Sequence, residues 1–174
     1  MRRCIFGLLS MALGSAAPLG ASDEAPGMPL RKAGLWELRT ETDEGAGPRT
    51  QALTMCVGDE MERETVRISN SENRANCPKY EINKASGRTT IDASCDYGDR
   101  KVTTRTVLEG DFTTTFRAKV VSSTDGNAPK AQGGHPVNVK RTILQEGTYV
   151  SESCGELKAG EARTADGRTV TVMQ

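Results

Sequence analysis

The chain has 174 residues, enough for one ordinary domain. Its 23 basic and 23 acidic residues balance, so it lacks the basic excess that an electrostatic nucleic-acid binder needs. Aromatic residues make up 4% of the chain and the mean hydropathy is −0.51, values that exclude a multispanning membrane protein.

Residues 1–21 are typical of a secretory signal peptide. Two arginines near the start precede an apolar stretch over residues 4–14, which is too short to remain as a membrane anchor, and small residues follow it. Cleavage after Ala21 would leave a Ser-Asp-Glu start, whereas cleavage after Ala17 would place a proline next to the cut. We therefore predict export to the periplasm, or secretion, with no membrane segment after signal removal. Residues 22–33 contain two prolines and a glycine and are predicted as a flexible leader.

The next segment predicts a first hairpin. Apolar or threonine side chains alternate with charged ones over residues 34–42, as in a half-buried strand, and residues 51–57 continue as a second strand after turn-forming residues. Residues 58–68 break this alternation and predict a helix of about two turns, which Asp59 can cap. Residues 69–76 are predicted as a polar loop.

A second hairpin follows, with a better defined register. A two-residue Ser-Gly turn at residues 86–87 would place Ile82 opposite Ile91 and Tyr80 opposite Ala93.

Four cysteines remain after removal of the signal peptide. In an oxidising compartment they suggest two disulfides, for which three connectivities are possible. The hairpin register brings Cys77 within one residue of Cys95, and Cys56 with Cys154 then follows by elimination. Because no Cys-x-x-Cys spacing occurs, the sequence does not support a thioredoxin-like redox site or a zinc knuckle.

A third hairpin is predicted from an alternation that keeps its parity. Apolar and threonine side chains occupy the even positions from Val102 to Val120, so the sum of paired residue numbers must be even. A three-residue loop at residues 109–111 meets this condition.

The C-terminal part is less regular. Residues 122–136 are predicted as a long flexible loop that holds the one histidine, His135, as a solvated side chain. Residues 137–144 return as a strand, and residues 147–154 close the domain. Residues 158–174 are predicted as a tail, or as a small Asp-Gly hairpin that nothing holds down.

These elements predict a mainly β fold. We expect a single antiparallel β-sheet domain over residues 34–157, with about seven strands, one short helix and two disulfides. The sheet is expected to be curled or to form an open barrel.

The chemistry-bearing residues do not form an active site in the sequence. There is no Gly-x-Ser-x-Gly elbow, no glycine-rich phosphate loop and no second histidine, so we expect no catalytic, cofactor or metal site and no enzymatic activity. Trp36 can be a core anchor or a platform on which a ligand stacks. Phe112 and Phe116 lie on the apolar face and could contact a ligand, whereas Arg105 and Arg117 lie on the charged face and could meet an acidic partner.

Two functions remain from different classes. The first is a non-enzymatic protein-contact module of the cell envelope, which would use a sheet face or edge. The alternative is a carrier of a small apolar ligand, with the sheet forming an open barrel-like pocket. The partner is therefore an unknown envelope protein or an apolar small molecule, and not a nucleic acid.

Several short motifs give the chain a likeness to a known family. They are the Gly34-Leu35-Trp36-Glu37 start, the strand-borne Met-Cys-Val around Cys56, the hairpin from Cys77 to Cys95 and the closing Cys154. With these motifs the chain resembles, over about residues 33–155, a family of small exported proteobacterial proteins catalogued as a domain of unknown function. The resemblance implies no activity and no catalytic residues.

Overall fold

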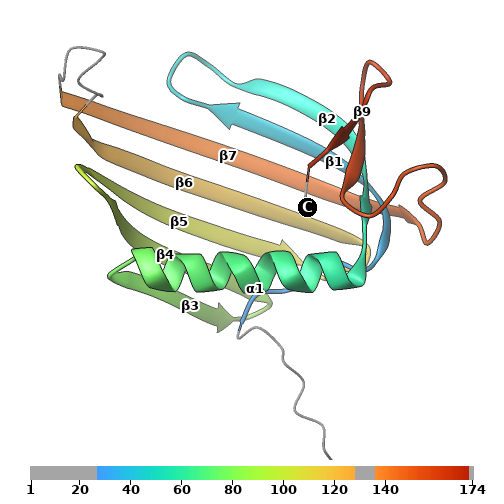
Figure 1. The fold of residues 1–174 in the computed structure, drawn as a ribbon, viewed down its shortest axis with the longest axis horizontal. Coiled ribbons are helices and arrows are strands. Elements are labelled where there is room, and N and C mark those ends of the chain that lie inside the picture. Colours follow the sequence, from blue (N-terminus) through green and yellow to red (C-terminus); the bar gives the residue numbers. More distant parts are fainter. Residues whose placement is uncertain (1–26, 128–135, 173–174) are drawn as a thin grey trace, which may run out of the picture.

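The computed structural model describes residues 27–127 and 136–172, and it has the mainly β architecture that the sequence predicts (Figure 1). The predicted signal peptide and His135 lie outside these residues. The elements in chain order are β1 (Gly34–Asp43), β2 (Arg49–Val57), α1 (Asp59–Asn76), β3 (Lys79–Ala85), β4 (Arg88–Tyr97), β5 (Arg100–Gly110), β6 (Thr115–Asn127), β7 (Pro136–Ser151), β8 (Glu161–Thr164) and β9 (Thr169–Thr171).

The strands form one antiparallel sheet. Its nine strands follow the order β3-β4-β5-β6-β7-β1-β2-β8-β9, so β3 and β9 are its two ends and the sheet is not closed. The sheet has two more strands than expected, because β8 and β9 join it through β2. The expectation that nothing holds the C-terminal hairpin is therefore wrong.

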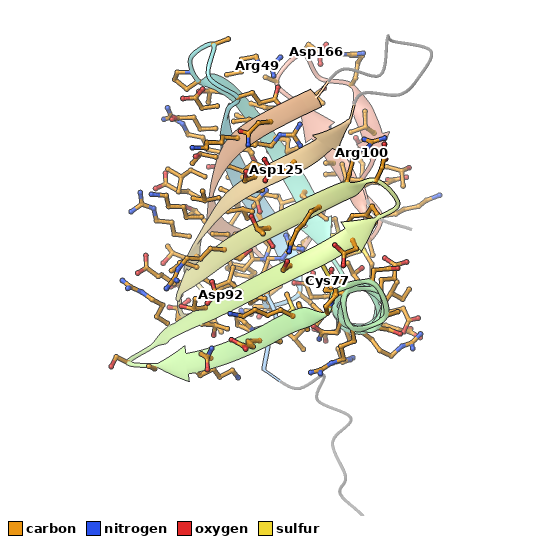
Figure 2. The ribbon with its side chains drawn as sticks, turned by 90° about the vertical axis from the view of Figure 1, so that its left-hand side faces the viewer. Arg49, Cys77, Asp92, Arg100, Asp125 and Asp166 are labelled. Atoms are coloured by element: carbon orange, nitrogen blue, oxygen red, sulfur yellow. A yellow bond between two sulfur atoms is a disulfide. The ribbon has the colours of Figure 1, made fainter. Side chains whose placement is uncertain are left out.

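The two sheet faces differ in what covers them. Helix α1 lies against one face, which we call the helix face, and Figure 2 shows this helix nearly end-on beside the sheet. The opposite side is called the open face. The buried core lies on the helix side and consists of Trp36, Leu38, Met55, Val57, Ile91, Leu108, Phe112, Phe116 and Ala162.

The first two predicted hairpins are present. Strands β1 and β2 form the first one, and the structure supplies its register, with Trp36 opposite Met55. In the next hairpin Ile82 lies opposite Ile91, and the turn residues Ser86 and Gly87 have φ angles of 50° and 73°. Both angles lie in the left-handed region that a two-residue type I′ turn requires. The predicted pairing of β3 with β4 is confirmed.

The third hairpin keeps the predicted parity but not the predicted loop. Leu108 pairs with Ala118, so the apolar positions of β5 and β6 share the helix face. The loop covers residues 111–114 instead of 109–111, because the Asp111 carboxylate accepts hydrogen bonds from the Thr114 hydroxyl and from backbone N–H groups of residues 113–115. The Thr114 hydroxyl and these backbone donors also hold the pKa of Asp111 well below its usual range.

Helix α1 is much longer than the predicted two turns. It has 18 residues and ends at Asn76, so the prediction of a polar loop over residues 69–76 is wrong. Its buried side chains are Glu62, Val66 and Asn70, spaced by four residues. Because two of these three buried residues are polar, they do not stand out in the sequence as an apolar repeat of helical spacing. Their partners come from other segments: Asn70 accepts a hydrogen bond of 2.5 Å from the Tyr80 hydroxyl.

Strands β6 and β7 extend further than the sequence predicts. Strand β6 continues to Asn127 and β7 starts at Pro136, so the ends of the predicted loop over residues 122–136 belong to strands. Strand β7 has 16 residues and joins the two segments that were predicted separately. At Gly147 a Cβ atom would overlap the ring of Phe116, which lies directly opposite on β6. The glycine therefore lets this aromatic ring pack flat on the sheet.

Residues 27–33, which we call the strap, lie packed on the helix face although the sequence indicates a flexible leader. The Arg31 side chain forms an ion pair of 2.6 Å with Glu62 of α1, and the two side chains are 10% and 8% exposed. The Lys32 N–H donates to the carbonyl of Phe112, and the Lys32 carbonyl accepts from the Trp36 indole N–H, both at 2.8 Å. The strap thereby connects α1 to the sheet.

We expect the Glu62→Gln variant to lose about 2 kcal/mol of unfolding free energy, since a buried hydrogen bond to Arg31 would lose its charge on the acceptor side. Urea denaturation measures this loss. The matched control is Glu64→Gln on the exposed side of the same helix, where the pair with Arg67 is solvated and its loss should leave stability nearly unchanged. Equal losses in the two variants would contradict a stabilising role of the strap contact.

Candidate functional site

The aromatic candidates lie in the core and not on the surface. Trp36 has no exposed surface, and its ring centroid lies 5.5 Å from those of Phe116 and Tyr149. Phe112 stacks on Phe116 at 5.4 Å, and both are more than nine-tenths buried. Trp36 thus has the position of a core anchor, and its one polar atom is already bonded to Lys32.

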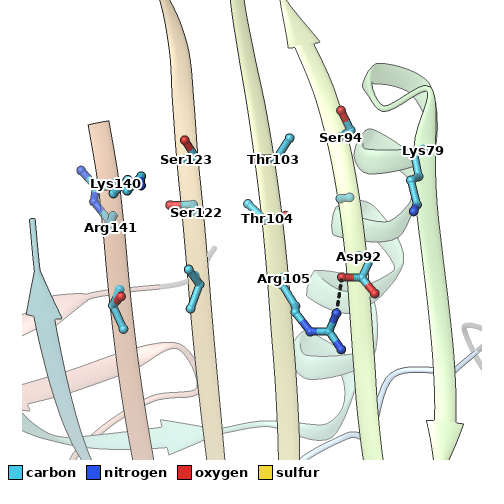
Figure 3. Close-up of a pocket in the computed structure, with 13 residues that line it drawn as sticks. Lys79, Asp92, Ser94, Thr103, Thr104, Arg105, Ser122, Ser123, Lys140 and Arg141 are labelled. Atoms are coloured by element: carbon cyan, nitrogen blue, oxygen red, sulfur yellow. Dashed lines mark ion pairs between the residues drawn. The ribbon is translucent and has the colours of Figure 1, made fainter. Parts of the chain in front are cut away.

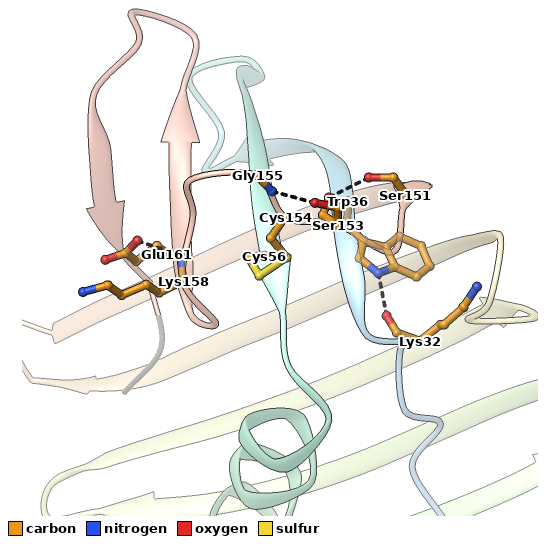
Figure 4. The surroundings of a disulfide bond; sticks show 9 residues. All are labelled: Lys32, Trp36, Cys56, Ser151, Ser153, Cys154, Gly155, Lys158 and Glu161. Carbon is orange, nitrogen blue, oxygen red and sulfur yellow. Dashed lines mark hydrogen bonds between the residues drawn. A yellow bond between two sulfur atoms is a disulfide. The ribbon is translucent and has the colours of Figure 1, made fainter.

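The four candidate cysteines form the two predicted disulfides, Cys56–Cys154 and Cys77–Cys95. Figure 4 shows Cys56 of β2 joined to the segment that follows β7. Ser153 shapes this segment, because its carbonyl accepts from the Ser151 hydroxyl and its own hydroxyl accepts from the Gly155 N–H.

The candidate arginines lie on the open face, in two different settings. Arg117 belongs to a ladder of alternating charge in which each residue pairs with its cross-strand neighbour, in the order Arg88, Glu109, Arg117, Glu146 and Arg39. Such a ladder satisfies its own charges and is typical of a solvated sheet face. Arg105 lies elsewhere, 3.5 Å from Asp92, and it lines a depression.

This depression is the strongest candidate site among the residues that the structure describes. Its volume is about 550 Å³, and it extends across strands β3 to β7 on the open face (Figure 3). The lining side chains are mostly hydroxyl-bearing or cationic. They come from Lys79, Asp92, Ser94, Thr103, Arg105, Val121, Ser123, Lys140 and Thr142, whereas Ala93, Thr104, Ser122 and Arg141 also border the depression but have side chains on the opposite face of the sheet.

Five of these residues form a straight row across five strands. Register pairs Lys79 with Ser94, Ser94 with Thr103, Thr103 with Ser123, and Ser123 with Lys140. We call these five residues the hydroxyl row. Since neighbouring strands are about 4.8 Å apart, the two terminal lysines are separated by about 19 Å at the backbone.

The lysines at the ends of the row are open to interaction. Lys79 lies 3.5 Å from Glu81, but both side chains are more than half exposed. Lys140 has no ion pair with any residue in the described ranges 27–127 and 136–172, and in Figure 3 its side chain extends toward β6. The row therefore offers three hydroxyl groups between two solvated cations.

Acidic residues flank the hydroxyl row on both sides. Two positions along the strands in one direction lie Asp96 and Asp125, and in the other direction lie Glu81 and Asp92. Asp92 is paired with Arg105, and Asp125 accepts a hydrogen bond from Asn138. Lys101 lies between Asp96 and Asp125, and Arg105 lies opposite Asp92, so each flanking row holds two carboxylates and one cation.

The sequence did not single out this row. The Ser-Gly turn pairs Lys79 with Ser94, but the sequence predicts Ser123 in a loop. It predicts Lys140 in a strand and does not identify the neighbouring strand. The row can therefore be recognised only when the registers of all four strand pairs from β3 to β7 are known.

The described residues form neither a metal-ligand cluster nor a membrane-spanning helix. Within them, no three or more His, Cys, Asp or Glu side chains are grouped so as to hold a metal ion. The helix found there is too polar to cross a membrane.

Comparison with known proteins gives one family. Residues 31–154 match the family model described as "Protein of unknown function (DUF3617)", and the chain therefore belongs to this family. The matched segment begins in the strap and ends at Cys154. No curated protein and no solved structure matches the chain.

Proposed function

We propose that this family member is an exported envelope protein that works by protein–protein contact, without catalysis, through its open face. The observation that best supports this proposal is the depression across β3–β7, in which Arg105, Val121 and Lys140 are exposed. On the helix face, α1 packs over β3 and β4 and the strap contacts both α1 and the sheet, whereas no described helix covers the open face (Figure 2).

Export is supported by two independent features. Residues 1–21 have the arrangement of a cleavable signal, and the four remaining cysteines form two disulfides, which persist in oxidising compartments such as the periplasm. Intact mass spectrometry of the full chain expressed in a bacterium tests this. We expect the mass of a chain starting near Ser22 with both disulfides formed. A full-length mass with free thiols would overturn the export proposal.

The contact function is supported over the apolar-ligand carrier by the position of the aromatic side chains. A carrier would need rings that line a space, whereas Phe112 and Phe116 stack on each other and Trp36 is covered completely. The absence of catalysis is supported by the lining of the depression, in which the one carboxylate, Asp92, is paired with Arg105.

Site-specific photo-crosslinking in cells tests the contact proposal. The crosslinker replaces Val121, which is 44% exposed in the depression, or Ile68, which is 40% exposed on α1. We expect a product of defined mass from position 121 and none from position 68. Equal products at both positions, or none at position 121, would count against the open face as the contact surface.

A further inference from the structure

We propose that the hydroxyl row binds an extended acidic segment of the partner protein, with one carboxylate at Lys79 and another at Lys140. This inference rests on the proposed contact function and adds the chemistry and spacing of the partner. It is carried by the row itself: five residues in register on five strands, with the order Lys, Ser, Thr, Ser, Lys.

The length of the row sets the spacing of the partner's charges. An extended chain advances about 3.3 Å per residue, so about six residues cover the 19 Å between the two lysines. The segment that fits best therefore carries acidic residues at positions i and i+6. Ser94, Thr103 and Ser123 lie between the lysines, where their hydroxyls can donate to and accept from the backbone or polar side chains of that segment.

The terminal lysines can accept new partners at low cost. Lys140 has no ion pair among the described residues, and the pair of Lys79 with Glu81 is solvated on both sides. Exposed pairs of this kind contribute little to stability, so a carboxylate from a partner can replace Glu81 beside Lys79.

The flanking acids make the strip selective for a narrow ligand. Asp96 and Asp125 on one side and Glu81 on the other lie about 7 Å from the row along the strands, because successive side chains on one face are two residues apart. Each flanking row also holds one cation, Lys101 or Arg105, but its two carboxylates leave it with a net charge of −1, which disfavours a broad polyanion such as a nucleic acid or an anionic membrane. The lining of the depression also contains no aromatic ring on which a base could stack.

One apolar side chain lies beside the row. Val121 is 44% exposed and is flanked on the neighbouring strands by Arg105 and Thr142. It can contact an apolar side chain of the partner segment, so an apolar contact can add to the two ion pairs in the binding of that segment.

Binding of synthetic peptides to the mature, disulfide-bonded protein tests the proposal by calorimetry. The probe is an acetylated and amidated heptapeptide, Glu-Ser-Thr-Val-Thr-Ser-Glu. In one control both glutamates are glutamines, and in the other the two glutamates are two residues apart. We expect the probe to bind about tenfold more tightly than either control at low ionic strength, and its affinity to fall as salt is raised.

Protein variants identify the site. Lys79→Gln and Lys140→Gln are each expected to lower the affinity for the probe peptide about three- to fivefold. Lys101→Gln is the matched control, because Lys101 is on the open face of β5 between Asp96 and Asp125 and outside the row. This control should bind the probe like the unmodified protein.

Several outcomes would overturn the inference. They are an equal loss of affinity in the Lys101 variant, binding that does not depend on the glutamate spacing, and tighter binding to phosphatidylglycerol vesicles through the same lysines. Absence of peptide binding together with a product from position 121 would refute the acidic segment and leave the contact function in place. Failure of both experiments would refute the contact function as well.

Discussion

Replacing Trp36 by alanine is expected to lower the free energy of unfolding by about 3–5 kcal/mol, as for other large aromatic side chains removed from a core. Trp36 is completely buried, its ring lies against Phe116 and Tyr149, and its indole N–H donates to the Lys32 carbonyl. The substitution leaves a cavity at the point where the strap meets the sheet. It also leaves the Lys32 carbonyl without this donor.

The measurement is equilibrium unfolding in urea followed by circular dichroism, because Trp36 is the one tryptophan and its fluorescence is lost in the variant. Val121→Ala, on the open face, is the control and should change stability by less than about 0.5 kcal/mol. A Trp36 variant that is as stable as this control would mean that the ring does not anchor the core. The platform interpretation of Trp36 would then return.

Removal of the Cys56–Cys154 disulfide is the second change with a large expected effect. Its two cysteines are 98 residues apart, and the chain-entropy model gives about 4.7 kcal/mol for a loop of this size. The double variant Cys56→Ala, Cys154→Ala should therefore be close to unfolded at moderate temperature, since small domains are stable by about 5–15 kcal/mol.

The other disulfide is the matched comparison. Cys77 and Cys95 are 18 residues apart, for which the same model gives about 3 kcal/mol. Urea unfolding of the two double variants without reductant should rank the long-loop variant as the less stable one. The opposite ranking would show that local geometry around β3 and β4 matters more than loop entropy.

The Cys56–Cys154 disulfide also affects the edge of the sheet that β8 and β9 form. The Cys56–Cys154 bond fixes residues 154–160 to β2, where the Gly160 N–H donates to the Cys56 carbonyl and β8 begins directly afterwards. Loss of this disulfide is therefore expected to loosen β8 and β9 before the central strands, which hydrogen exchange of their amides would show.

The candidate site could be predicted in part. The alternation of charged and apolar residues correctly separated Arg105 and Arg117 from the core, and it placed Phe112 and Phe116 on the opposite side. It did not indicate that the two arginines have different surroundings. One is in a charge ladder and the other lines the depression, and this difference depends on the residues that face them from three neighbouring strands.

By itself the sequence determined the local features of this protein: the alternating strands, the register of the β3–β4 hairpin, the parity of β5 and β6, and the Cys77–Cys95 pairing, from which Cys56–Cys154 follows by elimination. Each of these depends on a period of two residues or on a short turn, so that neighbouring residues carry the information. The tertiary structure alone decided the pairing of β1 with β7 and of β2 with β8, the length of α1, and the hydroxyl row. These features join residues far apart in the chain. Glu62 and Asn70 of α1 are buried where Arg31 and Tyr80, from distant segments, donate hydrogen bonds to their side-chain oxygens, while the Asn70 amide nitrogen has no partner among the described residues.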